Sequence, residues 1–219
     1  MITAYLNFEG RIVSKTTIYK YLKELGLKSI ARPKKYKYIQ GNLNKKFSNL
    51  LKRNFKTNKP NIIWCIDFTY FPYDKEKMRY NCTIIDLYNR KVVGSLNSGS
   101  IGSELALTTL KMALKRENIN NELILHSDQG SQFTSKIFTD YCKENKIIQS
   151  MSKAGCPYDN SPMEQFYNTL KTEFYKLYKF SDIKDLDRKT YEFIYVKYNY
   201  LRPHSYTNGL PLALYNSNT

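Results

Sequence analysis

The chain has 219 residues, of which 42% are hydrophobic, enough for one sizeable core, and its formal net charge is +16. It contains no run of 18 apolar residues, no apolar leader segment and no C-x-x-C pair among its four cysteines, which excludes a membrane-spanning protein, a zinc ribbon and a disulfide scaffold. We therefore expect a soluble, cytoplasmic protein whose partner is a polyanion, either a nucleic acid or an anionic membrane surface.

The positive charge is concentrated at the start of the chain. Residues 1–60 hold 15 Lys and Arg against 2 acidic residues, or +13, whereas residues 61–219 hold 20 against 17, or +3. A genome rich in A and T would explain the preference for lysine over arginine, but not this crowding. A domain whose positive and negative charges nearly balance therefore follows a strongly basic arm.

Residues 1–30 contain one predicted helix, which begins after Ser14 as N-cap and ends at Gly26. A lone short helix does not fold by itself, so we interpret this region as the remnant of a helix-turn-helix whose earlier helices are missing or lie upstream. Residues 31–60 are predicted to be a basic linker along DNA phosphates, with Lys34, Lys35 and Lys37 as contacts. The alternative is a linker that is merely solvated.

From residue 61 onward the pattern is typical of an ordered α/β domain. Three strands are followed by alternating helices and strands, and the turn between the second and third strands falls at Asn89 and Arg90. We predict a mixed sheet of five strands with helices on its faces, a core over residues 61–180 and a C-terminal helix and tail over 181–219. The predicted strands are 62–71, 78–89, 91–98, 122–128 and 147–152, and the helices are 103–118 (capped by Ser103), 135–146 and 162–204 with a break near Phe180.

Three acidic residues occupy unusual places in this pattern. Asp67 lies inside the first strand, Asp128 at the carboxyl end of an apolar strand, and Glu164 in the first turn of a helix. Carboxylate oxygens are the ligands that Mg²⁺ and Mn²⁺ prefer, and two such ions about 3.5–4 Å apart catalyse phosphoryl transfer on DNA. The three side chains are therefore candidates for one metal site.

Each of these acids also has a simpler interpretation. Asp67 could face solvent from an edge strand, and Asp128, which precedes Gly130, could nucleate a turn. Glu164 closes the capping-box pattern S-x-x-E that starts at Ser161, with Pro162 where a helix begins. From the residues alone both interpretations stay open.

Five longer stretches carry a resemblance to a known family: WCIDFTYF, IIDLYNRKVVG, LHSDQGSQFTS, SMSKAGCPYDNSPMEQFYNTLKTE and YNYLRPH. From about residue 10 to 215 the chain resembles transposases of the insertion-sequence-three family, the product of a second reading frame with a retroviral-integrase-type core. The family's pattern is two aspartates and a glutamate with about 35 residues between the last two. Asp128 and Glu164 have 35 residues between them.

The resemblance implies a ribonuclease-H-like fold and a DDE-type polynucleotidyl transferase with Asp67, Asp128 and Glu164 as metal ligands. It implies two Mg²⁺ or Mn²⁺ ions, cleavage of transposon ends, and strand transfer without a covalent enzyme intermediate. Lys171, seven positions after the glutamate, is implied to contact the DNA backbone. The implied partners are double-stranded DNA (transposon ends and target), further copies of the chain on DNA, and a protein from the upstream frame. A bacterial, nucleoid-associated location follows.

Several further residues belong to the family's motifs. His126 could orient a ligand or a DNA phosphate, or could be a packed, hydrogen-bonded histidine. Asp159 and Asn160 are expected to shape the loop before Glu164, and Gly130 to let the backbone approach the site. Arg202, in the YN..RPH segment, is a candidate for DNA contact, with helix packing as the alternative.

The chain departs from the family at its front, where members usually carry a fuller helix-turn-helix. Recognition of transposon ends is then either absent or supplied by another chain. One alternative is thus a truncated, non-catalytic DNA-binding repressor of transposition. Another is a nuclease for RNA–DNA hybrids, which the basic arm fits and the HSDQGSQF and DN motifs do not.

Overall fold

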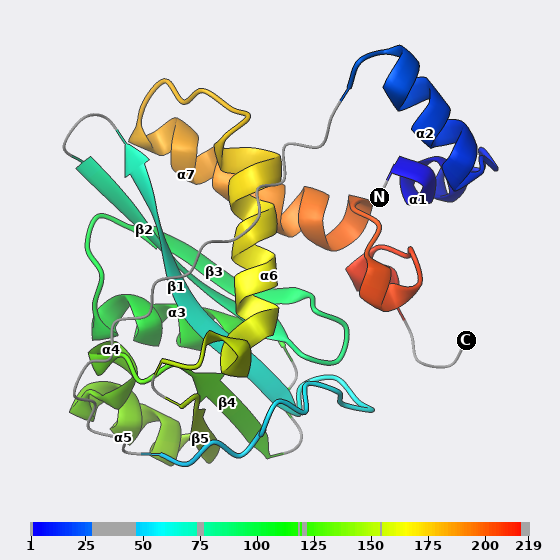
Figure 1. Cartoon of the computed structure of the whole chain (residues 1–219). Coiled ribbons are helices and arrows are strands. Elements are labelled where there is room, and N and C mark those ends of the chain that lie inside the picture. The colour runs from blue at the N-terminus through cyan, green and yellow to red at the C-terminus, as the bar shows by residue number, and fades with distance from the viewer. Residues whose placement is uncertain are drawn as a thin grey trace.

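Five strands form one mixed sheet, as the sequence predicted, and their order in it is β3-β2-β1-β4-β5 (Figure 1). The computed structural model describes residues 2–27, 47–73, 77–117, 119, 122–153 and 155–215; Lys34, Lys35 and Lys37 lie outside them. β1 pairs antiparallel with β2 and parallel with β4, so it lies in the centre of the sheet. The strands are β1 (Ile63–Tyr73), β2 (Lys77–Asp86), β3 (Val92–Ser98), β4 (Leu123–Ser127) and β5 (Ile147–Met151).

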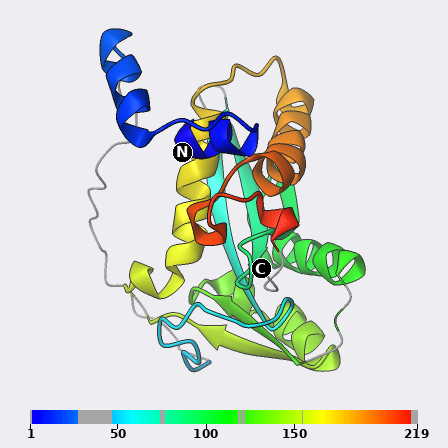
Figure 2. The same ribbon diagram turned by 90° about the vertical axis from the view of Figure 1, so that its right-hand side faces the viewer.

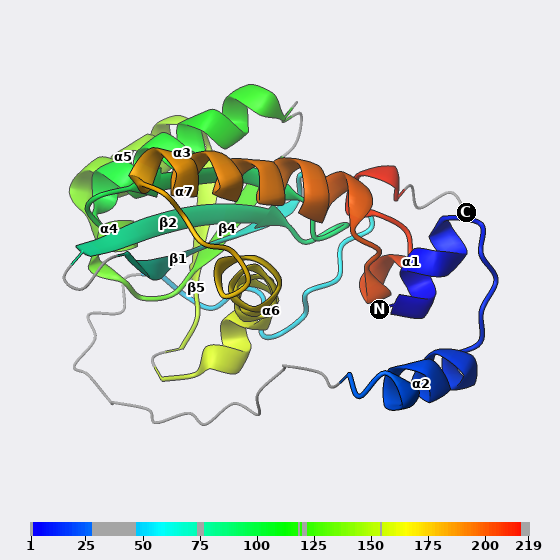
Figure 3. The same ribbon diagram turned by 90° about the horizontal axis from the view of Figure 1, so that it is seen from above.

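Alternating side chains of β1 pack in two hydrophobic cores, one on each face of the sheet. Trp64 and Ile66 pack with the helices α3 (Ser103–Arg116), α4 (Ser131–Thr134) and α5 (Lys136–Glu144). Cys65 and Phe71 pack against α6 (Ser161–Leu170) and the helical segments that follow it. Figures 2 and 3 show α6 on one side of the sheet and α3 and α5 on the other. A central strand buried on both faces explains the nearly continuous apolar run in this part of the sequence.

The C-terminal helices complete the core on the α6 side. After α6 the chain continues as a π-helix (η2, Lys171–Tyr175), and α7 (Ile183–Glu192) continues as a second π-helix (η3, Phe193–Leu201). Short 3-10 turns follow at η4 (Ser205–Thr207) and η5 (Leu212–Leu214), and another, η1 (Pro157–Asn160), precedes α6. Within the described ranges, no helix is both long and apolar enough to span a bilayer.

The N-terminal helices lie beside the C-terminal segment, away from the sheet (Figures 1 and 3). α2 (Lys15–Glu24) has the predicted cap, since the Ser14 side chain accepts a hydrogen bond from the Thr17 N–H at 3.0 Å. The helix α1 (Ile2–Phe8) precedes it and was not predicted. Gly26, which follows α2, has a φ of +64°, a conformation that favours glycine and explains why the helix ends there.

One local prediction was wrong, and one short helix was not predicted. Ser103 is the first residue of α3 rather than its cap; the cap position belongs to Gly102, whose extended backbone precedes the helix without a side-chain hydrogen bond. The helix predicted over 135–146 is confirmed as α5, and a short helix that was not predicted, α4, precedes it. Ser135 is extended (φ −63°, ψ 148°) and separates α4 from α5. Its hydroxyl donates to the Gln132 carbonyl, a local bond that competes with a continuous helix.

Candidate active site

Two neighbouring strands bring Asp67 and Asp128 together. In the parallel pair of β1 and β4, Cys65 lies opposite His126, so two residues further on Asp67 and Asp128 reach the same edge and the same face. That face is the one that α6 covers. The edge-strand alternative for Asp67 is therefore excluded, since β1 has partners on both sides.

Asp67 carries the strongest electrostatic perturbation of the three acids. Burial raises the pKa of its carboxyl group to about 8, and the charges of Asp128 and Glu164 act in the same direction. The Phe68 N–H, which donates to Asp67 Oδ1 at 2.7 Å, and the more distant Lys171 oppose the shift. Asp128 and Glu164 thus lie within electrostatic reach of Asp67, and a cation would relieve their repulsion of its charged form.

Asp128 forms the turn that was one of its two interpretations, and its role as a metal ligand stays a prediction. It directly follows β4, and its Oδ1 accepts a hydrogen bond from the Gly130 N–H at 2.9 Å, so it does form a turn. A Cβ atom at Gly130 would lie 2.9 Å from that same oxygen and 2.7 Å from Gln132 Oε1. A side chain at this position would therefore have to displace these two side-chain oxygens. Crowding of the carboxyl group by protein raises its pKa, and the Gly130 N–H opposes the rise.

The capping box predicted at Ser161 is wrong in its position. Ser161 is the first residue of α6, Pro162 follows within the first turn, and the cap position belongs to Asn160, which makes no side-chain capping bond. Glu164 is partly buried, and its charge raises the pKa of Asp67. Glu164, in the first turn of α6, therefore lies within electrostatic range of Asp67.

Asn160 places an amide beside Asp67. Its side chain is buried (5% exposed), and Nδ2 lies 3.4 Å from Asp67 Oδ2 as a long hydrogen bond. Its Oδ1 is buried and has no hydrogen-bond partner among the described residues. A buried amide oxygen without a partner is costly, and this one lies next to the carboxylates.

His126 and Asp159 hold the turn that precedes Asn160. A backbone carbonyl only accepts, so the bond of 2.9 Å from His126 Nε2 to the Asp159 carbonyl requires the proton on Nε2. Nδ1 then accepts from the Ser150 hydroxyl at 2.9 Å, and burial lowers the pKa of His126, which keeps it neutral. Of its two predicted roles, His126 takes the packed, hydrogen-bonded one. Asp159 is likewise buried, as expected of a residue that shapes the loop.

The two basic residues predicted to contact DNA differ in their surroundings. Lys171 is partly buried at the end of α6, and its Nζ lies 4.8 Å from the centre of the Tyr70 ring. Desolvation and the charge of Lys176 lower the pKa of Lys171, whereas the charge of Asp67 opposes this shift. Arg202 is 5% exposed and donates through two nitrogens to the Glu173 carboxylate, at 2.7 and 2.8 Å. This buried pair gives Arg202 the packing role rather than a surface for DNA.

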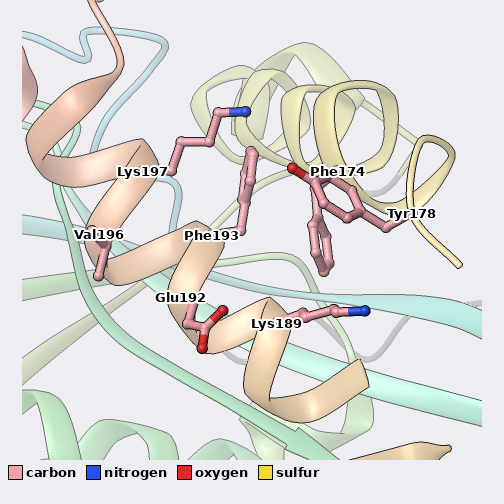
Figure 4. A pocket seen from close by; sticks show the side chains of 7 residues that line it. All are labelled: Phe174, Tyr178, Lys189, Glu192, Phe193, Val196 and Lys197. Carbon is pink, nitrogen blue, oxygen red and sulfur yellow. The ribbon is translucent and has the colours of Figure 1, made fainter. Parts of the chain in front are cut away.

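The described residues contain no group of three His, Cys, Asp or Glu side chains arranged to hold one metal ion. Asp67, Asp128 and Glu164 are thus electrostatic neighbours without forming a closed set of ligands. A cavity of about 340 Å³ elsewhere lies between the η2 segment and α7–η3 and includes none of the three (Figure 4). Its lining is Phe174, Tyr178, Lys189, Glu192, Phe193, Val196 and Lys197.

Comparison with known proteins identifies the family. Two family models, both described as integrase core domain, match residues 57–157 and 145–211. The transposase for insertion sequence element IS904 of Lactococcus lactis is 33% identical over 220 residues, which cover 99% of this chain and 87% of that protein. This chain belongs to the insertion-sequence transposases.

Two more relatives support the assignment. The putative transposase InsK for insertion sequence element IS150 of Escherichia coli K12 is 33% identical over 193 residues, 88% of this chain and 68% of that protein. Transposase InsF for insertion sequence IS3A, from the same organism, is 35% identical over 162 residues, 74% of this chain and 56% of that protein. The resemblance to the insertion-sequence-three family is thereby confirmed.

Solved structures confirm the fold. The HTLV-2 integrase catalytic core domain in complex with magnesium (trimeric form) matches with a TM-score of 0.57 at 19% identity, over 71% of this chain and 96% of that one. The catalytic core domain of BIV integrase matches with a TM-score of 0.52 at 16% identity, over 71% and 93%. The five-stranded mixed sheet with its flanking helices is therefore the ribonuclease-H-like fold of integrase cores.

Two residues of this transposase that bear on the site were missed by sequence reasoning. The Tyr167 hydroxyl donates to the Asp67 carbonyl, which ties α6 to β1. The Arg53 guanidinium donates to Asp159 Oδ1 at 2.7 Å, across 106 positions of sequence. Tyr167 lies one helical turn after Glu164, a spacing that could have drawn attention to it; no sequence signal marks the partner of Arg53.

Proposed function

We propose that this transposase cuts and joins DNA as a DDE-type polynucleotidyl transferase, with Asp67, Asp128 and Glu164 as its metal-binding carboxylates. The observation that carries this proposal is the pKa of Asp67, which burial, Asp128 and Glu164 all raise. A fold gains no stability from three acids gathered at a partly buried edge, so the arrangement is best explained by a cation.

The donor set fits Mg²⁺ or Mn²⁺, which prefer hard oxygen ligands. No described residue forms a salt bridge with Asp67 or Asp128, and the orphaned Asn160 Oδ1 adds a neutral oxygen beside them. We expect two ions held by the three carboxylates; when bound, they would activate the attacking oxygen and stabilise the leaving one. Magnesium in the HTLV-2 integrase core, which shares the fold, is consistent with this choice.

The remaining roles fall to residues around the carboxylates. Asp67 has to lose its proton before it can bind a cation, so metal binding should release protons near neutral pH. Lys171, which lies within electrostatic range of Asp67, is proposed to contact a phosphate of the DNA backbone. The attacking group is water or a DNA 3′-hydroxyl, so no serine, tyrosine or cysteine nucleophile is required.

The partners follow from the reaction. The proposed substrates are double-stranded transposon ends and target DNA, and Lys34, Lys35 and Lys37 remain predicted DNA contacts. Because two transposon ends must be joined to one target, we expect more than one copy of the chain on the DNA. A protein from the upstream reading frame is the proposed supplier of end recognition.

Strand transfer with 3′-hydroxyl DNA ends in Mg²⁺ or Mn²⁺ tests the proposal. Glu164→Gln keeps the shape of the side chain but removes the charge. We expect joining to fall by at least about 100-fold, because a bound metal ion contributes several kcal/mol to stabilising the transition state and each 1.36 kcal/mol is worth about tenfold in rate. The matched control is Glu104→Gln, another first-turn glutamate, exposed on α3, which should join at the wild-type rate.

Two outcomes would contradict the proposal. Joining by Glu164→Gln at the wild-type rate would remove Glu164 from the metal site. An absence of joining by every variant and by the wild type, with DNA binding retained, would instead favour the non-catalytic repressor.

A further inference from the structure

A polar groove lies beside the candidate active site, between residues 48–53 and the turn before α6. It has a volume of about 600 Å³, within the range of ligand clefts of about 300–1,000 Å³. Small-molecule clefts are mostly apolar, but every residue that lines this groove is polar or charged. The lining is Ser48, Asn49, Lys52, Arg53, Lys153 and Asp159, which we call the 48–53 groove.

The wall formed by residues 48–53 is fixed to the catalytic core. Leu51 is 5% exposed and packs in the core on the α6 side. The Leu50 N–H donates to the Ser150 hydroxyl at 3.0 Å, and the Met151 N–H donates to the Ser48 carbonyl at 3.2 Å. This segment, which the sequence assigned to a linker, is therefore a built part of the structure along β5.

The turn inside this wall has an unusual backbone. Lys52 and Arg53 both lie in the left-handed region, with φ values of +46° and +68°. For a residue other than glycine this conformation costs about 1 kcal/mol or more. The Asn49 side chain holds the turn, since its Oδ1 accepts from the Lys52 N–H at 2.9 Å. Two consecutive basic residues thus adopt a conformation that neither favours.

Asp159 fixes Arg53 at the groove. Its two carboxylate oxygens accept from Arg53 Nε at 2.7 Å and from Asn49 Nδ2 at 2.9 Å, and the Lys153 N–H adds a bond at 3.1 Å. Burial raises the pKa of Asp159, but these donors outweigh it and hold the pKa below its ordinary value. Asp159 therefore remains charged and orients the guanidinium.

The groove keeps a positive charge after this pairing. Lys52, Arg53 and Lys153 supply three cations against the single carboxylate of Asp159, and the Arg53 side chain is 58% exposed. Its terminal nitrogens make no hydrogen bond within the described part of the chain. An oriented guanidinium with free donors is suited to a phosphate group.

We propose that the 48–53 groove binds a phosphodiester of DNA next to the active site. The inference rests on the proposed function for its ligand, because a strand held at the carboxylates would continue past them. Asp159, in the wall of the groove, is followed directly by Asn160, which contacts Asp67. A phosphate in the groove would thus contact the same turn that leads into α6 and Glu164.

The test uses the full chain and two charge-matched double variants. Lys52→Ala with Lys153→Ala removes two exposed groove cations whose side chains make no described bond, while leaving Arg53 and Asp159 in place. Lys115→Ala with Lys184→Ala removes two exposed lysines from α3 and α7, outside the groove. Affinity for a labelled DNA duplex is measured by fluorescence anisotropy in EDTA over a series of salt concentrations.

Counterion release predicts a loss of about eightfold in affinity at 0.1 M salt for each phosphate contact removed, and a fall of about 0.9 in the slope of log K against log salt. We expect the groove variant to bind DNA about 10- to 60-fold more weakly than the wild type. We also expect its salt slope to fall by the amount that one to two phosphate contacts contribute. The control variant should lose less than about threefold, because diffuse charges are screened within about 10 Å. Equal losses in both variants would overturn the proposal.

Two further measurements keep the result specific. Thermal unfolding of both variants should match the wild type, since the removed side chains are exposed. Inorganic phosphate is titrated separately: saturable binding that the groove variant loses, with duplex affinity unchanged, would assign the groove to a free anion and overturn the DNA assignment. Because no step of this test requires strand transfer, the groove proposal can be correct even if the catalytic proposal fails. The catalytic proposal can likewise be correct even if the groove proposal fails.

Discussion

At the residue scale, the pKa of Asp67 connects the proposed chemistry with the stability of the metal-free protein. The ordinary pKa of an aspartate is 3.8, and here it is raised to about 8. Below pH 4 the carboxyl group is protonated in both the folded and the unfolded chain. As the pH rises toward 8, the unfolded chain loses the proton while the folded chain keeps it, so the free energy of unfolding falls.

Asp67→Asn should therefore stabilise the metal-free protein. The amide resembles the protonated acid, and each pKa unit is worth about 1.4 kcal/mol. Solvent access to this partly buried group reduces the expected gain to about 1–2 kcal/mol at pH 8, with a smaller gain at pH 5. Urea unfolding in EDTA at both pH values measures it. The exposed Asp140→Asn should change stability by less than about 0.5 kcal/mol, and an equal gain at both pH values for Asp67→Asn would contradict the raised pKa.

The three carboxylates could be selected from the sequence as candidates because of their places in the predicted strands and helix and because of the motif spacing. Hydrogen bonds between distant segments could not. The expected cap at Ser161 failed because the cap position, Asn160, turns its amide to Asp67. DNA contact and packing stayed open for Arg202 because its carboxylate partner, Glu173, lies 29 positions away on a neighbouring helix. Sequence patterns reveal which residues are polar, but not which of them pair.

At the element scale, α6 and the η2 segment are attached to β1 by two tyrosines. The Tyr167 hydroxyl donates to the Asp67 carbonyl, and the Tyr175 hydroxyl donates to the Pro72 carbonyl further along the strand. The first bond joins the helix that carries Glu164 to the residue at the centre of the site. The second joins the same two elements away from the carboxylates.

Tyr167→Phe and Tyr175→Phe form a matched pair that separates stability from catalytic placement. Each removes one hydroxyl–carbonyl bond, so each should lower the free energy of unfolding by about 1 kcal/mol. Strand transfer should fall by about tenfold or more only in Tyr167→Phe, because a small displacement of reacting groups is costly. Rates are compared at saturating DNA. Equal rates in the two variants would show that this bond does not set the position of Glu164.

At the scale of the whole molecule, the cores include residues from beyond the predicted boundaries at 61 and 180. Phe47 and Leu51 pack from the N-terminal side, and Phe193, Ile194, Tyr198 and Leu212 from the C-terminal side. A helical pattern indicates an apolar face but not which core it meets, so the segment after residue 180 was read as an appendage. The strand order, by contrast, follows from short hairpins and parallel crossovers, which leave few alternatives.

Two truncations test which segments the fold requires. Burial of a large apolar side chain contributes about 1.5–3 kcal/mol, so the four C-terminal core residues contribute about 6–12 kcal/mol, comparable to the typical stability of a whole domain of about 5–15 kcal/mol. A chain of residues 1–180 should therefore show no cooperative urea transition in near-ultraviolet circular dichroism. A chain of residues 47–219 should unfold cooperatively within about 2 kcal/mol of the full protein, because α1 and α2 contain no buried residue. Cooperative unfolding of residues 1–180 at the wild-type midpoint would instead establish that the core ends where the sequence placed its boundary.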